Sequence, residues 1–109
     1  MTKLTRKLAE AQELHAQDQT VIFRLYTEHR DNLVDLTRRY FDGATFYFGV
    51  GIYKGGIETA RIIEIVGKLA DLQNVVHLAG DIRELNSQSA VLVAWHKATS
   101  IVVAVSEGN

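Results

Sequence analysis

The sequence predicts one domain of the α+β class, in which two helices cover one face of an antiparallel sheet. Three observations lead to this prediction. Short segments alternate apolar and polar residues, two segments between them have helical spacing, and a glycine-containing turn joins two adjacent extended segments. The chain has 109 residues, so residues 1–109 are expected to form a single small domain with one core.

The first elements are predicted to be a helix, a strand and a second, short helix. Residues 1–18 place leucines along one side and charged residues elsewhere, which is typical of an amphipathic helix. Thr20 to His29 alternate with period two, which indicates a strand. Asp31 is the predicted N-cap of a short helix that continues through Phe41. Its buried residues are expected to be Leu33, Leu36 and Tyr40.

Residues 46–64 predict a β-hairpin. If Gly55-Gly56 occupy the centre of a tight primed turn, Tyr53 lies directly opposite Glu58. The same register pairs Gly51 with Ala60, Gly49 with Ile62, and Tyr47 with Glu64. This face has little side-chain bulk in its middle and is expected to form a shelf. The opposite face should lie beneath the helices and consists of Phe46, Phe48, Val50, Ile52, Ile63 and Ile65.

The second half of the chain predicts a helix and two strands. Asp71 is the predicted cap of the helix, and Gly80 within it predicts close packing against the sheet. Its buried stripe should be Leu72, Val75, Val76, Ala79, Ile82 and Leu85. After Asn86-Ser87, Gln88 is expected to open a strand that ends at His96, and a last strand runs from Ser100 to Val105.

Residues 20–105 therefore follow the order β-α-β-β-α-β, which corresponds to a ferredoxin-like antiparallel sheet, with an added N-terminal helix and an extra C-terminal strand. In this arrangement the sheet face that carries Tyr53 and Glu58 is left uncovered by the helices. A ligand, the N-terminal helix or another subunit is needed to cover it.

Composition excludes several classes of function. A net charge of −1 without a basic stripe gives no support for binding nucleic acid or an anionic membrane. The absence of cysteine excludes disulfides, thiolate catalysis and cysteine-ligated zinc. No segment approaches the roughly 20 apolar residues of a spanning helix, and the polar start is not a secretory signal. A cytoplasmic location is expected.

Common catalytic motifs are also missing. The glycines of the hairpin lack the dinucleotide-binding spacing, and there is no phosphate-binding loop. The four histidines do not share the spacing of a zinc site, so no metal is expected. None of the serines lies in a nucleophile elbow.

The remaining candidates are Tyr53, Glu58, Glu64, Tyr47 and Gln88. Each has an ordinary structural explanation, as an exposed cross-strand pair, the solvent side of a strand or the end of a helix. Their combination at one end of a glycine-lined shelf favours a binding site for a small polar molecule.

Three segments then resemble a known family. Gly51-Ile52-Tyr53, Glu58 to Ile65 and Gln88 to Val93, in this order, resemble the bacteriophage S-adenosylmethionine lyases, formerly described as S-adenosylmethionine hydrolases. The resemblance covers the chain from Val21 to Val105. The hairpin turn before the glutamate is shorter here than in the family, which leaves both Glu58 and Glu64 open as the functional acid.

The resemblance implies cleavage of S-adenosylmethionine to 5′-methylthioadenosine and L-homoserine lactone, without metal or added cofactor. The substrate's own carboxylate attacks its γ-carbon, so the enzyme mainly folds the substrate into attack geometry. The resemblance implies a catalytic role for Tyr53 and Glu58. The implied substrate-binding residues are Gln88, Gly51, Gly49, Tyr47 and Glu64. It also implies a homotrimer with sites between subunits, located in the host cytoplasm if the protein is phage-encoded.

Two other classes of function stay open. A non-enzymatic phage counter-defence protein on the same scaffold would sequester an adenine nucleotide signal and leave it intact. A small assembly protein would use the N-terminal helix and the open sheet face to bind partners. Within the enzyme class, hydrolysis to homoserine is the alternative to lactone formation.

Overall fold

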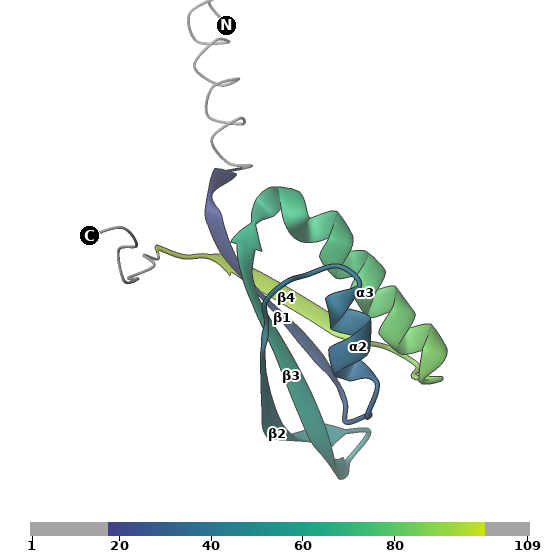
Figure 1. Ribbon diagram of the computed structural model, residues 1–109. Helices are drawn as coiled ribbons and strands as arrows, with labels where there is room; N and C mark the ends of the chain where they lie inside the picture. The colour runs from purple at the N-terminus through teal and green to yellow at the C-terminus, as the bar shows by residue number, and fades with distance from the viewer. Residues whose placement is uncertain (1–17, 100–109) are drawn as a thin grey trace, which may run out of the picture.

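The computed structural model describes residues 18–99 of the chain (Figure 1). The predicted strand from Ser100 to Val105 lies outside the described residues. So does the predicted N-terminal helix of residues 1–18, apart from its last residue.

The described part is an α+β fold with a four-stranded antiparallel sheet and two α-helices. The strands are β1 (Thr20–Glu28), β2 (Thr45–Tyr53), β3 (Gly56–Lys68) and β4 (Leu92–Lys97), in the order β2-β3-β1-β4. Helix α2 (Leu33–Arg38) follows β1. The short 3-10 helix η1 (Leu69–Asp71) leads from β3 into α3 (Leu72–Leu85).

Both helices pack on the same face of the sheet, as Figure 1 shows. The core lies between the two helices and the sheet. It contains alternate residues of the central strands β1 and β3, which confirms the predicted strand periodicity. The sheet contributes Val21, Phe23, Leu25, Ile63 and Ile65. The helices contribute Leu33, Leu36, Val75, Leu78, Ala79 and Ile82.

The hairpin register differs from the predicted one by two residues. The turn consists of Lys54 and Gly55, both with positive φ (50° and 79°), which is typical of a primed two-residue turn. Gly56 therefore belongs to β3 and pairs with Tyr53. The remaining pairs on this face are Gly51 with Glu58, Gly49 with Ala60, Tyr47 with Ile62, and Thr45 with Glu64. A shift of two residues keeps every side chain on its face, so Tyr53 and Glu58 still share one side but are diagonal neighbours.

Helix α2 is shorter than predicted and does not use the predicted cap. It begins after Asn32 rather than Asp31, and the N-cap makes no side-chain hydrogen bond. The predicted burial of Leu33 and Leu36 is confirmed. Tyr40 lies beyond the helix end and donates a hydrogen bond of 2.6 Å to Asp81 of α3, which ties the connection after α2 to the second helix.

The buried stripe of α3 differs from the prediction at four positions. Val76 and Leu85 are more than half exposed, Leu72 is only partly buried, and Leu78, which was not predicted, is fully buried. Gly80 is exposed and has no heavy atom within 4 Å of the position where a Cβ would stand, so the predicted close packing is wrong. Asp71 is the N-cap residue of α3, but its carboxylate accepts a hydrogen bond from the backbone N–H of Lys68 instead of capping α3.

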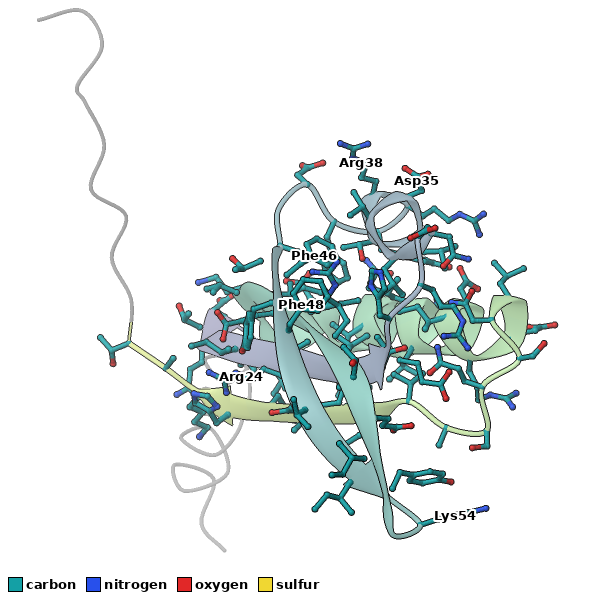
Figure 2. All side chains as sticks on the ribbon, turned by 90° about the horizontal axis from the view of Figure 1, so that it is seen from below. Arg24, Asp35, Arg38, Phe46, Phe48 and Lys54 are labelled. Carbon is teal, nitrogen blue, oxygen red and sulfur yellow. The ribbon has the colours of Figure 1, made fainter. Side chains whose placement is uncertain are left out.

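The outer half of the hairpin extends beyond the helices, so the prediction that helices cover this whole face is wrong (Figure 1). Helix α2 has six residues and is about 9 Å long, whereas the nine residues of β2 extend about 30 Å. Figure 2 shows Phe46 on the side of β2 toward α2 and Lys54 at the far tip. Four apolar side chains on the helix-facing side are 61–80% exposed and form what we call the hairpin apolar surface: Phe48, Val50, Ile52 and Ile57.

Neither α2 nor α3 has the length and apolar character that crossing a membrane requires, and residues 18–99 contain no other helix that does.

Candidate functional site

One end of the open sheet face carries a pocket of about 290 Å³. The end of β1, the tip of the β2–β3 hairpin and the connection from α3 to β4 surround it. The lining residues are 26–28, 51–53 and 88–90, together with Glu58, Ala60 and Leu92. Four residues singled out from the sequence are therefore brought together here: Gly51, Tyr53, Glu58 and Gln88.

Glycine keeps the floor of the pocket open on β2. Gly51 lies opposite Glu58 in the ladder, and a Cβ at Gly51 would come within 4.0 Å of the Glu58 Cγ. A larger side chain at Gly51 would therefore project into the space beside the carboxylate. Gly49 lies farther along β2, where a Cβ would stand 2.9 Å from the end of the Ile62 side chain, and it does not line the pocket.

Gln88 is placed by the C-terminus of α3. Ser87 has a left-handed φ of 54°, and its N–H donates to the Glu84 carbonyl at 3.3 Å. The N–H of Gln88 donates to the Arg83 carbonyl at 2.9 Å. These two bonds form a Schellman motif, which turns the chain back toward the sheet. Gln88 lies in this connection and not in a strand, because β4 begins only at Leu92.

The side-chain amide of Gln88 is buried against β1. Its Oε1 accepts a hydrogen bond of 2.9 Å from the Thr27 hydroxyl and one of 3.4 Å from the backbone N–H of Glu28. Its Nε2 is buried and has no hydrogen-bond partner among the described residues. A buried donor without an acceptor is unfavourable, so an acceptor that reached it would stabilise the site.

Two phenols and two carboxylates supply the polar character of the pocket. Tyr53 lies near the loop, with its hydroxyl 3.4 Å from the Ser89 Oγ. Tyr26 and Tyr53 are partly exposed, and Glu28 and Glu58 lie on neighbouring central strands. Lys, Arg and His are absent from the described residues that line this pocket. Glu28 is paired with Arg30, which does not line this pocket, whereas Glu58 has no ion-pair partner among the described residues. The charge of Glu58 therefore favours a cationic ligand over an anionic one.

The structure does not bring the other predicted site residues into this pocket. Glu64 accepts hydrogen bonds from Arg24 Nε at 2.9 Å and from the Tyr47 hydroxyl at 3.3 Å, in the middle of the open face. His96 lies beside this group, with Nδ1 3.4 Å from Arg24. The pKa of Arg24 is raised above its ordinary value, because the neighbouring Tyr47 hydroxyl and the hydrogen bond and charge of Glu64 together outweigh the opposing effect of partial burial. Glu64 is thus already paired with a permanent cation.

Sequence reasoning missed Thr27, Tyr26, Glu28 and Ser89 as pocket residues. A signal for Thr27 is present in the strand pattern. Val21, Phe23 and Leu25 alternate toward the core, and Thr27 continues this series with a hydroxyl where an apolar residue is expected. Such a buried polar residue needs a partner, which here is Gln88.

Within residues 18–99, no cluster of three or more histidine and acidic side chains has the arrangement of a metal site. No protein-family model matches this chain, and no curated protein and no solved structure is significantly similar to it.

Proposed function

We propose that this protein binds S-adenosylmethionine in the pocket beside Gln88 and cleaves it to 5′-methylthioadenosine and L-homoserine lactone. The observation that carries the proposal is the chemistry of the pocket lining, which combines the unpaired carboxylate of Glu58, two phenols and a buried amide, while the second carboxylate, Glu28, is paired with Arg30 outside the lining. S-Adenosylmethionine carries a sulfonium and an ammonium, so both of its cations meet acidic or aromatic groups in such a site.

The reaction needs positioning more than acid–base catalysis. An oxygen of the substrate carboxylate forms a bond to the γ-carbon, and the electron pair of the broken C–S bond returns to sulfur. No proton is transferred. The positive sulfonium and the negative carboxylate neutralise each other, so a site that excludes water favours the step. The protein must hold the methionine part in a folded conformation, with the carboxylate behind the γ-carbon.

Each pocket residue has a role in this proposal. Glu58 binds the substrate ammonium or a ribose hydroxyl, Tyr53 presents its ring or hydroxyl toward the sulfonium, and Gln88 donates its amide N–H to a substrate acceptor. Gly51 leaves room for the ligand. The pairing of Glu64 with Arg24 supports Glu58 as the functional acid of the two.

The strand order and the family resemblance support a ferredoxin-like fold. The order β2-β3-β1-β4 is the one that a ferredoxin-like β-α-β-β-α-β connection produces. The same three segments that resemble the phage S-adenosylmethionine lyases include Gly51, Tyr53, Glu58 and Gln88, which meet in the pocket.

We also propose that the active form is a homotrimer with sites between subunits. The pocket volume of about 290 Å³ lies near the lower limit for a small-molecule site, which is about 300–1,000 Å³. A neighbouring subunit would enclose the rest of the substrate. The hairpin apolar surface next to the pocket is suited to such a contact. A cytoplasmic location, that of the host if the protein is phage-encoded, gives access to the substrate, whose depletion would weaken methylation-dependent restriction.

A protein that sequesters an adenine nucleotide signal is less well supported, because an acidic pocket repels phosphate groups. A pure assembly protein does not account for the unpaired amide of Gln88.

The direct test is incubation of the purified protein with S-adenosylmethionine, with 5′-methylthioadenosine followed by chromatography and mass spectrometry. We expect turnover, with homoserine lactone as the second product. In ¹⁸O-labelled water, the lactone should be free of label when first released, whereas a hydrolase would introduce label into homoserine. Absence of turnover over hours would refute the lyase assignment.

Substitutions of pocket residues test whether the pocket is the active site. Tyr53→Phe and Glu58→Gln should each lower turnover by about ten-fold or more, since each removes a hydrogen-bonding or charged group from the substrate site. Glu84→Gln on the exposed face of α3 is the matched control and should retain wild-type turnover. Wild-type rates in both pocket variants would place the active site elsewhere.

A further inference from the structure

We infer that Thr27 is a positioning residue, whose hydroxyl holds the Gln88 amide so that the amide nitrogen faces a hydrogen-bond acceptor of the ligand. The inference rests on the proposed function, because it concerns the same pocket. It adds a residue on β1 that contacts Gln88 rather than the reacting atoms, and it specifies the ligand chemistry at this point.

The surroundings of the amide fix its orientation. The backbone N–H of Glu28, 3.4 Å away, can only donate, so the amide atom that faces it must be the oxygen. The Thr27 hydroxyl donates to the same oxygen at 2.9 Å, the shorter of its two contacts with an acceptor, since the Glu28 carbonyl oxygen lies 3.2 Å away. If the amide were reversed, its NH₂ group would face another N–H donor. The N–H of Glu28 therefore places Oε1 toward β1 and directs Nε2 away from it, and the Thr27 hydroxyl then holds Oε1 in place.

Because Gln88 and Thr27 are buried, the orientation of the amide determines which ligand groups can bind there. Gln88 is only 7% exposed, Thr27 only 5%, and Nε2 has no acceptor among the described residues. No described protein group accepts a hydrogen bond from this donor, and Gln88 lines the pocket, so a bound ligand that reaches Nε2 gains by placing an acceptor there. For S-adenosylmethionine the available acceptors are the adenine ring nitrogens, the ribose oxygens and the carboxylate. A ligand with an apolar group or a donor at this point is rejected.

Two elements hold Gln88 from opposite ends. The Schellman motif fixes its backbone through the 2.9 Å bond from its N–H to the Arg83 carbonyl. Thr27 fixes its side chain from the neighbouring strand. Without the hydroxyl, the long side chain of Gln88 is free to leave its productive rotamer, and part of its binding contribution is lost to conformational entropy.

The kinetic test uses Thr27→Val, which keeps the shape of the side chain and removes the hydroxyl. We expect kcat/KM for S-adenosylmethionine to fall about five-fold, chiefly through KM, which corresponds to one lost hydrogen bond in the site. Thr27→Ser should restore most of the loss. The matched control is Thr37→Val, because Thr37 is also a buried threonine and donates to the Leu33 carbonyl within α2, away from the pocket. An equal effect of both valine variants would overturn the inference.

A double-mutant cycle tests whether Thr27 acts through Gln88. In a Gln88→Leu background, Thr27→Val should cause no further loss, since its target is already absent. Independent, additive effects of the two substitutions on kcat/KM would contradict the positioning role.

A spectroscopic readout separates this inference from the proposed function. The side-chain amide resonances of Gln88 are the pair that disappears from the ¹H–¹⁵N correlation spectrum of Gln88→Leu. They should move in Thr27→Val and stay in place in Thr37→Val, with no ligand present. If wild-type protein fails to cleave S-adenosylmethionine, the proposed function fails and this spectrum alone decides on Thr27. Unchanged Gln88 resonances in Thr27→Val would overturn the positioning role even in an active enzyme.

Discussion

Two glutamates on the same face of β3 have different surroundings, and this difference bears on the proposed chemistry. Glu64 is paired with Arg24 at 2.9 Å and accepts a hydrogen bond from Tyr47. Glu58 lines the pocket and has no ion-pair partner among the described residues. An unpaired carboxylate beside aromatic rings is suited to an ammonium or sulfonium ligand, whereas a paired one contributes mainly to the sheet surface.

The charge of Glu58 should be visible in ligand selectivity. Glu58→Gln is expected to weaken binding of S-adenosylmethionine about ten-fold, since a hydrogen bond to a charged group contributes about 1.5–3 kcal/mol. Binding of neutral 5′-methylthioadenosine should change much less. Saturation kinetics give KM for S-adenosylmethionine, and isothermal titration calorimetry gives the affinity for 5′-methylthioadenosine, with Glu84→Gln as the control. An equal loss for the charged and the neutral ligand would argue against a charge interaction.

Gly51 tests whether the shelf is a binding surface. Its backbone φ is not in the left-handed region, and only Glu58 atoms approach the Cβ position, at 4.0 Å. Gly51→Val should therefore fold normally and favour the strand conformation, while its methyl groups fill the pocket floor. We expect thermal stability equal to or above wild type and at least a ten-fold loss of ligand affinity, about 1.4 kcal/mol. Unimpaired ligand binding would show that the ligand lies elsewhere.

At the scale of elements, α3 contains a glycine whose replacement should stabilise the protein. Gly80 is exposed within the helix and its Cβ position is free of neighbours, so glycine there contributes flexibility without a packing role. Gly80→Ala should raise the free energy of unfolding by about 1 kcal/mol, because alanine has the higher helix propensity. Denaturant unfolding with an unchanged m-value measures the gain. A destabilised variant would mean that a partner packs closely on this side of α3.

The link between the end of α2 and α3 should give a pH dependence of stability. The hydrogen bond that Tyr40 donates to Asp81, followed by burial and the Asp81 charge, raises the pKa of Tyr40 above its usual 10.0. The folded state then holds this proton more tightly than the unfolded state. Its contribution is complete below pH 10 and is lost as the pH rises through the folded-state pKa.

Tyr40→Phe removes this contribution. The variant should be less stable than wild type at pH 7, and the difference should shrink above pH 10. Chemical denaturation at pH 7, 9, 10 and 11 gives the two curves. The difference between the two proteins isolates the contribution of Tyr40. A difference that stays constant with pH would contradict a proton-linked interaction.

The order and type of the described elements could be predicted from the sequence, because period-two and helical patterns are local properties of the chain. The hairpin register could not, since it depends on whether Lys54 accepts a left-handed φ, and in the structure it does. The sequence likewise did not predict that Val76 is exposed and Leu78 buried. Both residues are apolar, and the position of the helix on the sheet decides which of them faces the core. The face shared by Tyr53 and Glu58 was nevertheless predictable, since a two-residue shift preserves alternation.

At the scale of the whole molecule, the described fold has more sheet than its two helices can cover. The hairpin apolar surface lies on the outer half of β2 and β3, and Ile52 belongs both to this surface and to the pocket lining. The two lie on opposite faces of the hairpin, so a subunit that packs on this surface and extends around Ile52 at the hairpin tip would also reach the pocket. Burial of one such valine or isoleucine contributes about 1.5–3 kcal/mol, so three or four of them provide a substantial part of an interface.

The oligomer and the activity should accordingly be lost together. Val50 is 80% exposed on the hairpin apolar surface and does not line the pocket, so Val50→Lys opposes subunit contact without changing the site directly. We expect wild-type protein to be a trimer by size-exclusion chromatography with light scattering, and Val50→Lys to be smaller and at least ten-fold less active, a loss of about 1.4 kcal/mol in transition-state stabilisation. Val76→Lys, at a half-exposed position of α3, is the matched control and should remain trimeric and active. A fully active monomer would refute the shared site, and an intact trimer in Val50→Lys would place the interface on another surface.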